Sequence, residues 1–326
     1  MLKKLVLLML GLAISLSACG SPQVQNDAGA LTHIRLPLGY IANIQFAPLY
    51  AAIEKGYFKD AGIEIEFDYS FETDGVKLVG AGELPFAVAS GEQVLLARAQ
   101  DVPVTYVAAW YQQFPISVVA KSDEDIAAPQ DLKGKKIGLP GLFGANYIGL
   151  QALLFSAGLS ESDVQLEAVG FNQVEVLATG QQEVVVGYAA NEPIQLRAQG
   201  FDVTELRVAD YVQLASNGIL ASEKVIAENP QLVNAFVEAF LKGLKYTIDN
   251  PDEAYAMSAT YIPNFADLDQ AVQKDILATS IEMWKAERLG YSDPQAWENM
   301  NDILVQMKLI PEPLDLTKAF TNEFVP

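Results

Sequence analysis

The stretch from residue 34 to residue 67 constrains the fold most, because the period of its apolar residues changes twice. Alternating apolar residues over 34–38 predict a half-buried strand. Helical spacing over 46–53 and renewed alternation over 63–67 predict a helix and a second strand. The pattern therefore predicts a βαβ unit whose first loop, 40–45, follows the carboxyl end of a strand, where open α/β sheets bind ligands.

The first 18 residues have the features of an export signal. Two lysines precede a short apolar run, and small residues come before Cys19. The run is too short to span a bilayer comfortably. Leu16-Ser-Ala-Cys19 resembles a bacterial lipobox, in which the cysteine is lipidated; an ordinary signal peptide with an incidental cysteine is the alternative. We expect residues 1–18 to be a lipoprotein signal peptide, Cys19 to carry the lipid, and residues 19–30 to be a linker.

Such an anchor implies an extracytoplasmic protein, held at the outer face of the bacterial cytoplasmic membrane. The 326-residue chain has 41 acidic and 21 basic residues, a net charge of −20 that becomes −22 without the two lysines of the signal peptide. This charge repels nucleic acids, which are therefore not expected as partners.

The sequence has no second long apolar run that would indicate a transmembrane segment.

The chain has few side chains of the types that act in catalysis or bind metals. Cys19 is the only cysteine, so neither a disulfide framework nor a thiolate metal site is expected. The single histidine, His33, begins the first predicted strand, away from any carboxyl end. A Ser-His-Asp set and a His/Cys metal cluster are therefore excluded. We expect a binding protein rather than an enzyme, with no metal and no cofactor.

The rest of the mature chain alternates strand and helix patterns and then becomes helical after about residue 221. The fold class is α/β, and the chain length allows two lobes. We expect each lobe to have a central, mostly parallel sheet flanked by helices. Residues 31–121 and 220–326 would form lobe I and residues 122–219 lobe II, with the ligand in a cleft that closes by hinge motion.

Polar residues at strand ends and helix starts supply candidate ligand contacts. Ser90 and Gln93 predict a capping box, which competes with a binding role for the adjacent Glu92. Capping explains Asn191, but glutamate is a poor N-cap, so Glu192 is the better binding candidate. The candidate ligand-binding residues are Tyr40, Asn43, Phe46, Glu92, Trp110, Tyr111, Asn146, Tyr147, Tyr188, Asn191, Glu192 and Asn217.

Two loops bear on the chemistry of the ligand. Residues 110–114 contain three aromatic residues after a predicted strand, which indicates either a buried anchor or a platform on which a flat ligand stacks. The glycine-spaced loop 138–144 opens a helix and can hold an anion on backbone N–H groups. It is not a P-loop, and no lysine or arginine follows it closely in sequence, which disfavours a phosphate or sulfonate ligand.

Four segments carry a resemblance to a known family. They are residues 39–67, the stretch Phe86-Ala-Val-Ala-Ser-Gly-Glu92, the segment Asp131-Leu-Lys-Gly-Lys-Lys-Ile-Gly138, and Glu192-Pro193. The chain resembles lipoprotein solute-binding subunits of ABC importers with the type II periplasmic-binding-protein fold. Within these it is similar, over residues 34–310, to the family that binds the thiamine pyrimidine precursor and riboflavin and that includes a fungal pyrimidine synthase. Nitrate, sulfonate and taurine binders share much of this framework.

The resemblance implies a small-molecule ligand, a monomeric binding subunit, and an ABC permease with its ATPase as partners. The fungal synthase uses a histidine as substrate and a lysine-bound cofactor, chemistry that looks unavailable with His33 alone. Pyrimidine binders often have a histidine in the first loop, where this chain has residues 43–46, Asn-Ile-Gln-Phe. We therefore expect riboflavin as the ligand, with a hydroxymethyl- or formyl-aminopyrimidine next, then an organic anion such as a sulfonate. An extracytoplasmic enzyme acting on such a heterocycle is the alternative of a different class.

Aromatic residues in the loops favour the larger heterocycle: Tyr40, Phe46, Trp110, Tyr111, Phe143, Tyr147, Tyr188 and Tyr211. The hypothesis is that three tyrosines stack on its ring: Tyr111, Tyr147 and Tyr188. Its polar edge would be bound by Asn43, Glu92, Asn146, Asn191 and Glu192.

Overall fold

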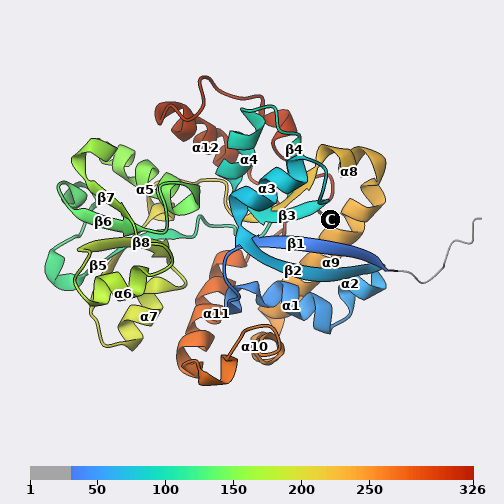
Figure 1. The fold of residues 1–326 in the computed structure, drawn as a ribbon, viewed down its shortest axis with the longest axis horizontal. Helices are drawn as coiled ribbons and strands as arrows, with labels where there is room; N and C mark the ends of the chain where they lie inside the picture. The colour runs from blue at the N-terminus through green and yellow to red at the C-terminus, as the bar shows by residue number, and fades with distance from the viewer. Residues whose placement is uncertain (1–30) are drawn as a thin grey trace, which may run out of the picture. The chain divides into compact units, whose positions relative to one another are not determined.

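The expected βαβ unit opens residues 31–326, the part of the chain that this computed structural model describes (Figure 1). Its strands, β1 Thr32–Gly39 and β2 Ile63–Phe71, pair in parallel. Two helices connect them, α1 Ala47–Glu54 and α2 Tyr57–Asp60. The predicted signal peptide, lipid-bearing cysteine and linker lie outside the described residues. No helix within the described residues is both long and apolar enough to cross a membrane.

The strands of the described residues form three sheets. The remaining strands are β3 Phe86–Ala89, β4 Val104–Ala109, β5 Ile116–Lys121, β6 Lys136–Leu139, β7 Gln165–Ala168, β8 Val184–Tyr188, β9 Val203–Arg207 and β10 Gly218–Ser222. Besides β1–β2 there is a three-stranded sheet ordered β3-β10-β4 and a five-stranded sheet ordered β7-β6-β8-β5-β9. β10 runs antiparallel to both its neighbours, and so does β5. Three of the seven strand pairings in the described residues are therefore parallel and four are antiparallel, so the α/β class is confirmed but the sheets are mixed rather than mostly parallel.

Helices cover these sheets (Figure 1). The other α-helices are α3 Glu72–Gly80, α4 Gly91–Arg98, α5 Gly144–Ser156, α6 Gln173–Ala178, α7 Glu192–Ala198, α8 Glu223–Glu228, α9 Pro230–Asp249, α10 Pro251–Ser258, α11 Gln270–Trp284 and α12 Pro294–Gln306. The predicted C-terminal helices are present. Asn229 caps α9 by accepting a hydrogen bond from the backbone N–H of Leu232, 3.1 Å away.

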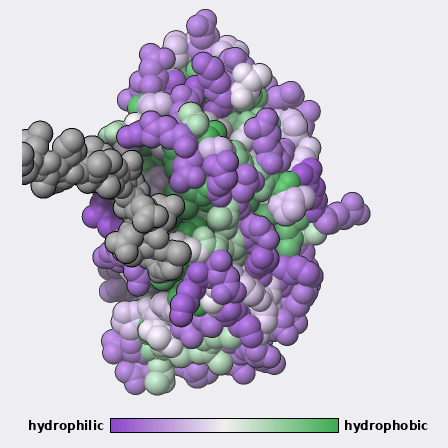
Figure 2. Space-filling model, turned by 90° about the vertical axis from the view of Figure 1, so that its right-hand side faces the viewer, coloured by the Kyte–Doolittle hydropathy of each residue, from purple (hydrophilic) through white to green (hydrophobic). Residues whose placement is uncertain are grey.

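The longest helix, α9, packs its apolar face against the βαβ unit. Phe236 of α9 stacks on Phe86 of β3 with ring centroids 4.2 Å apart and also contacts Phe58 of α2. Trp284 and Trp297 are buried in the core. Figure 2 shows that one face of the molecule is largely hydrophilic, with apolar residues gathered near its middle.

The strand pairing can be compared with the expected lobe boundaries. The chain crosses into the five-stranded sheet between β4 and β5 and crosses out of it between β9 and β10. The second crossing falls between residues 207 and 218, just before the boundary expected at residue 220. The first falls before β5, because residues 116–121 pair with β8 and β9, whereas the sequence places those residues in lobe I. The division into two lobes stays a prediction.

Candidate functional site

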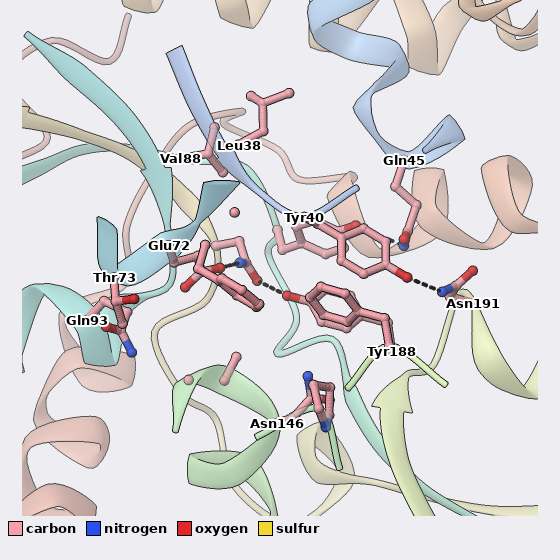
Figure 3. A pocket seen from close by; sticks show the side chains of 18 of the residues that line it. Leu38, Tyr40, Gln45, Glu72, Thr73, Val88, Gln93, Asn146, Tyr188 and Asn191 are labelled. Carbon is pink, nitrogen blue, oxygen red and sulfur yellow. Dashed lines mark hydrogen bonds between the residues drawn. The ribbon is translucent and has the colours of Figure 1, made fainter. Parts of the chain in front are cut away.

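A pocket lies where loops from all three sheets meet (Figure 3). It holds about 960 Å³ of empty space, part of it open to solvent. Nine predicted site residues line it: Tyr40, Phe46, Trp110, Tyr111, Asn146, Tyr188, Asn191, Glu192 and Asn217. The other lining residues are Leu38, Gly39, Gln45, Phe71, Glu72, Thr73, Val88, Gln93, Pro140, Phe143, Gly144, Ala145, Phe171 and Gln173.

Three predicted residues are absent from this lining and make other contacts. Asn43 caps the short 3-10 helix before α1 by accepting a hydrogen bond from the backbone N–H of Gln45 at 2.9 Å. The hydroxyl of Tyr147 donates to Glu161, 2.5 Å away, so this ring is not placed to stack on a ligand. Glu92 is buried in the first turn of α4.

Glu72, at the start of α3, is the polar centre of the pocket wall. Its Oε1 accepts a hydrogen bond from Asn217 Nδ2 at 2.9 Å. The same amide, through Oδ1, accepts from the Tyr188 hydroxyl at 3.1 Å. Figure 3 shows Glu72, Tyr188 and Asn146 around one space. The three-residue chain therefore links the end of β2, the loop before β10 and the end of β8.

A second carboxyl group lies behind Glu72. The Ser90 hydroxyl is 2.6 Å from Glu72 Oε2 and also contacts Glu92 Oε1. The predicted capping box is therefore wrong: Ser90 makes no side-chain cap, and Gln93 bonds to Glu92 at 3.3 Å. Burial raises the pKa of Glu72, and burial together with the charge of Glu72 raises the pKa of Glu92 to about 8.

Glu192 is the third carboxyl group and opens α7. Its Oε2 accepts the backbone N–H of Tyr188 at 2.7 Å, and its Oε1 accepts from Asn191 Nδ2 at 3.1 Å. Asn191 makes no cap hydrogen bond, although the sequence favoured that role. Burial raises the pKa of Glu192 to about 7. A Cβ at Gly187 would lie 2.4 Å from the Glu192 carboxylate, so the glycine leaves the space that this side chain fills.

The two aromatic residues after β4 belong largely to the core. Trp110 and Tyr111 are 1% and 6% exposed. Tyr111 contacts Trp284 and Tyr188 edge-to-face, with ring centroids 5.8 and 6.2 Å away, and its hydroxyl accepts from Gln45 Nε2 at 3.2 Å. Tyr111 thus reaches the pocket without presenting an open ring face, which leaves the stacking hypothesis without support from this ring.

Sequence reasoning missed Glu72, Phe71 and Phe171, and it named Phe143 only among the aromatic residues of the loops. Phe71, Phe143 and Phe171 line the pocket and yet are 49%, 51% and 36% exposed. The expected second strand ended at residue 67, whereas β2 continues to Phe71. Extending the alternation of that strand to its end would have placed Phe71 and Glu72 at a carboxyl end, with the other candidates.

The electrostatic character of the pocket follows from its residue types. None of its lining residues is lysine or arginine, whereas Glu72 and Glu192 are both present. Asn146 lines the pocket, and its buried Oδ1 has no hydrogen-bond partner among the described residues. His33 lies elsewhere, at an exposed position near the start of β1, with its Nε2 3.3 Å from Glu66 Oε2. No cluster of potential metal ligands occurs in residues 31–326. The arrangement suits an uncharged ligand with aromatic surface and hydrogen-bond donors.

Solved structures of other proteins share this fold. A periplasmic aliphatic sulphonate binding protein from Escherichia coli superposes with a TM-score of 0.72 at 14% identity, over 89% of this chain and 92% of that one. A Candida albicans protein described as exhibiting the generic periplasmic binding protein structural fold gives 0.67 at 16% identity, over 91% and 98%. The expected periplasmic-binding-protein fold is therefore confirmed.

Sequence comparisons then identify the family to which the chain belongs. The family model described as NMT1/THI5 like matches residues 43–254, and the chain belongs to this family. It is 42% identical to riboflavin-binding protein RibY of Chloroflexus aurantiacus, over 99% of this chain and 98% of that protein. A formylaminopyrimidine-binding protein of Halalkalibacterium halodurans is 28% identical over 98% and 99%. A 4-amino-5-hydroxymethyl-2-methylpyrimidine phosphate synthase of Legionella pneumophila is 22% identical over 90% and 93%.

Proposed function

We propose that this protein is the extracytoplasmic substrate-binding subunit of an ABC importer, and that it captures riboflavin and delivers it to a membrane permease. The pocket carries this proposal, because its aromatic walls surround uncharged and acidic acceptors and no basic group. The 42% identity to a riboflavin-binding protein along nearly the whole chain supports it. Lipidation of Cys19 would hold the subunit beside its permease and ATPase.

The chemistry of riboflavin matches the pocket. Riboflavin is neutral, with a flat ring system that carries an imide N–H and with a side chain that carries hydroxyl groups. Glu72 and the partnerless Asn146 Oδ1 accept hydrogen bonds from such donors, and the lining aromatic residues contact the ring. A ligand group that reaches Asn146 would satisfy an acceptor that the free protein leaves unpaired.

A thiamine pyrimidine precursor is the second candidate, supported by the formylaminopyrimidine-binding relative. Its amino group would suit the same carboxylates. A sulfonate is disfavoured, because Glu72 and Glu192 would repel it and no lining residue is cationic. Catalysis is disfavoured because no histidine lines the pocket.

The test is a fluorescence titration of riboflavin with the purified protein. We expect saturable one-to-one quenching at or below about micromolar concentration. Asn146→Ala should weaken binding roughly five- to a hundredfold by removing the acceptor. The matched control is Asn234→Ala, at an exposed position of α9 outside the pocket, which should bind as the wild type does.

Two outcomes would contradict the proposal in different ways. Absence of quenching, with saturable binding of the aminopyrimidine, would remove riboflavin and keep the importer role. Recovery of a chemically altered ligand after incubation, measured by chromatography and mass spectrometry, would replace the binding role with an enzymatic one.

A further inference from the structure

Three phenylalanines at the pocket share an unusual exposure. The large aromatic residues of the core, such as Trp110 and Phe236, are at most 7% exposed. Phe71, Phe143 and Phe171 are instead 36–51% exposed while lining the pocket. Exposed apolar surface that gathers at one place is typical of a binding site, since burying it on ligand binding is favourable.

The three phenylalanines come from different parts of the chain. Phe71 ends β2 in the two-stranded sheet, whereas Phe143 follows β6 and Phe171 follows β7 in the five-stranded sheet. They nevertheless contact one another through their rings. Ring centroids of Phe71 and Phe171 are 5.7 Å apart with an interplanar angle of 27°, and Phe143 meets Phe71 edge-on at 6.2 Å.

These contacts join the sheets by side chains alone. β1–β2 and the five-stranded sheet share no strand pairing. Tyr40, after β1, adds an edge-to-face contact with Phe171 at 4.8 Å. Aromatic pairs of this kind contribute only about 0.5–1.5 kcal/mol beyond their buried area, so a flat ligand can replace them by supplying the same faces.

Phe71 and the polar centre of the pocket are adjacent in sequence. A ligand whose donor binds Glu72 therefore has its ring beside Phe71. We propose that Phe71 and Phe171 form an aromatic clamp that opens to receive the ring system of the ligand between its faces, with Phe143 closing the edge. This inference rests on the proposed function and names the residues that select a wide ring system over a single pyrimidine ring.

The clamp predicts which substitutions reduce affinity. Phe71→Ala and Phe171→Ala should each weaken riboflavin binding about five- to a hundredfold, because an aromatic face in contact with a ring is lost. Phe71→Tyr retains the ring and should stay within about threefold of the wild type. Tyr211→Ala is the matched control, since Tyr211 is 44% exposed but does not line the pocket.

Calorimetric titrations with three probes test the clamp separately from the proposed function. The probes are riboflavin, lumichrome as a tricyclic ring without the hydroxyl-bearing chain, and 4-amino-5-hydroxymethyl-2-methylpyrimidine. We expect the alanine variants to lose affinity for both tricyclic probes and to unfold at the wild-type temperature. Wild-type affinity for riboflavin in Phe71→Ala and Phe171→Ala would overturn the clamp and leave the proposed function intact.

Failure of the wild type to bind riboflavin would overturn the proposed function. The affinity of each variant for lumichrome would then test the aromatic clamp. Loss of lumichrome affinity in Phe71→Ala and Phe171→Ala, but not in Tyr211→Ala, would sustain it. Equal lumichrome affinity in all variants, or no lumichrome binding by the wild type, would overturn it.

Discussion

Ser90 has one hydroxyl hydrogen and two carboxyl neighbours, Glu72 and Glu92. It can donate to only one of them, so the second contact is a hydrogen bond only if a carboxyl group itself carries a proton. Glu92 Oε2 is buried without a partner, which makes ionisation of this group unfavourable. The pair therefore holds a proton near neutral pH, and burial is the main reason.

This proton makes stability depend on pH in a definite direction. The pKa of Glu92 is raised from 4.5 to about 8, so between these values the folded protein keeps a proton that the unfolded chain has lost. The free energy of unfolding should therefore fall as pH rises through this window and level off above it. In Glu92→Gln, this decrease in the free energy of unfolding with rising pH should be smaller by more than about 1 kcal/mol. Urea unfolding at several pH values measures it.

Glu64→Gln, at an exposed position of β2, is the control and should keep the wild-type slope. The same slope in Glu92→Gln and in the wild type would show that the Glu72–Glu92 pair holds no extra proton.

At the scale of elements, β1 ends in a glycine that leaves space for the first side chain of α3. Gly39 has φ +79°, and a Cβ there would lie 2.4 Å from Glu72 Cγ. The strand therefore ends at a residue without a side chain, directly against the side chain that opens α3. The same position requires a left-handed backbone, which other residues adopt at a cost of about 1–2 kcal/mol. The polar centre of the pocket thus depends on how two elements meet.

Gly39→Ala should therefore impair both stability and binding. Its matched control is Gly56→Ala, where φ is +76° and nothing lies within 4 Å of the added Cβ. Both variants bear the backbone strain, about 1–2 kcal/mol, but only Gly39→Ala must displace Glu72. We expect urea unfolding to show a larger loss for Gly39→Ala and titration to show weaker riboflavin binding in that variant alone. Equal behaviour of the two alanine variants would contradict the role of this contact.

At the scale of the whole molecule, a strongly acidic chain surrounds a pocket without basic residues. The net charge of −20 belongs mostly to dispersed surface carboxylates, whereas the pocket has Glu72 and Glu192. An anion would be repelled both on approach and when bound, while a neutral ring compound would not. The charge distribution thus favours the same class of ligand as the aromatic lining of the pocket.

The dependence of ligand affinity on salt concentration tests whether the site binds a neutral ligand. Affinity for riboflavin should change less than about twofold between roughly 50 and 500 mM NaCl, because screening acts on charged ligands. Excess methanesulfonate should not displace riboflavin. A steep salt dependence, or displacement by the sulfonate, measured by the same fluorescence titration, would point to an anion site instead.

Much of the fold is readable from local patterns. The βαβ unit, β3 at residues 86–89 and the helices from α9 onward follow from apolar periodicity and capping residues that act within a few positions of each other. The family resemblance rests on the same segments. Side-chain partners were less predictable: the capping box expected at Ser90 and Gln93 is replaced by bonds to Glu72 and Glu92, since Glu72 is distant in sequence but adjacent in space.

Local sequence by itself therefore determined the α/β class, most of the elements and many polar residues at strand ends, because periodicity and turn chemistry are short-range properties. Only the tertiary structure decided which of those residues share a pocket. It turned Asn43, Glu92 and Tyr147 toward other partners, and it brought Glu72 and the exposed phenylalanines 71, 143 and 171 to the pocket. The physical reason is that hydrogen bonding and burial depend on neighbours that only the folded chain brings together.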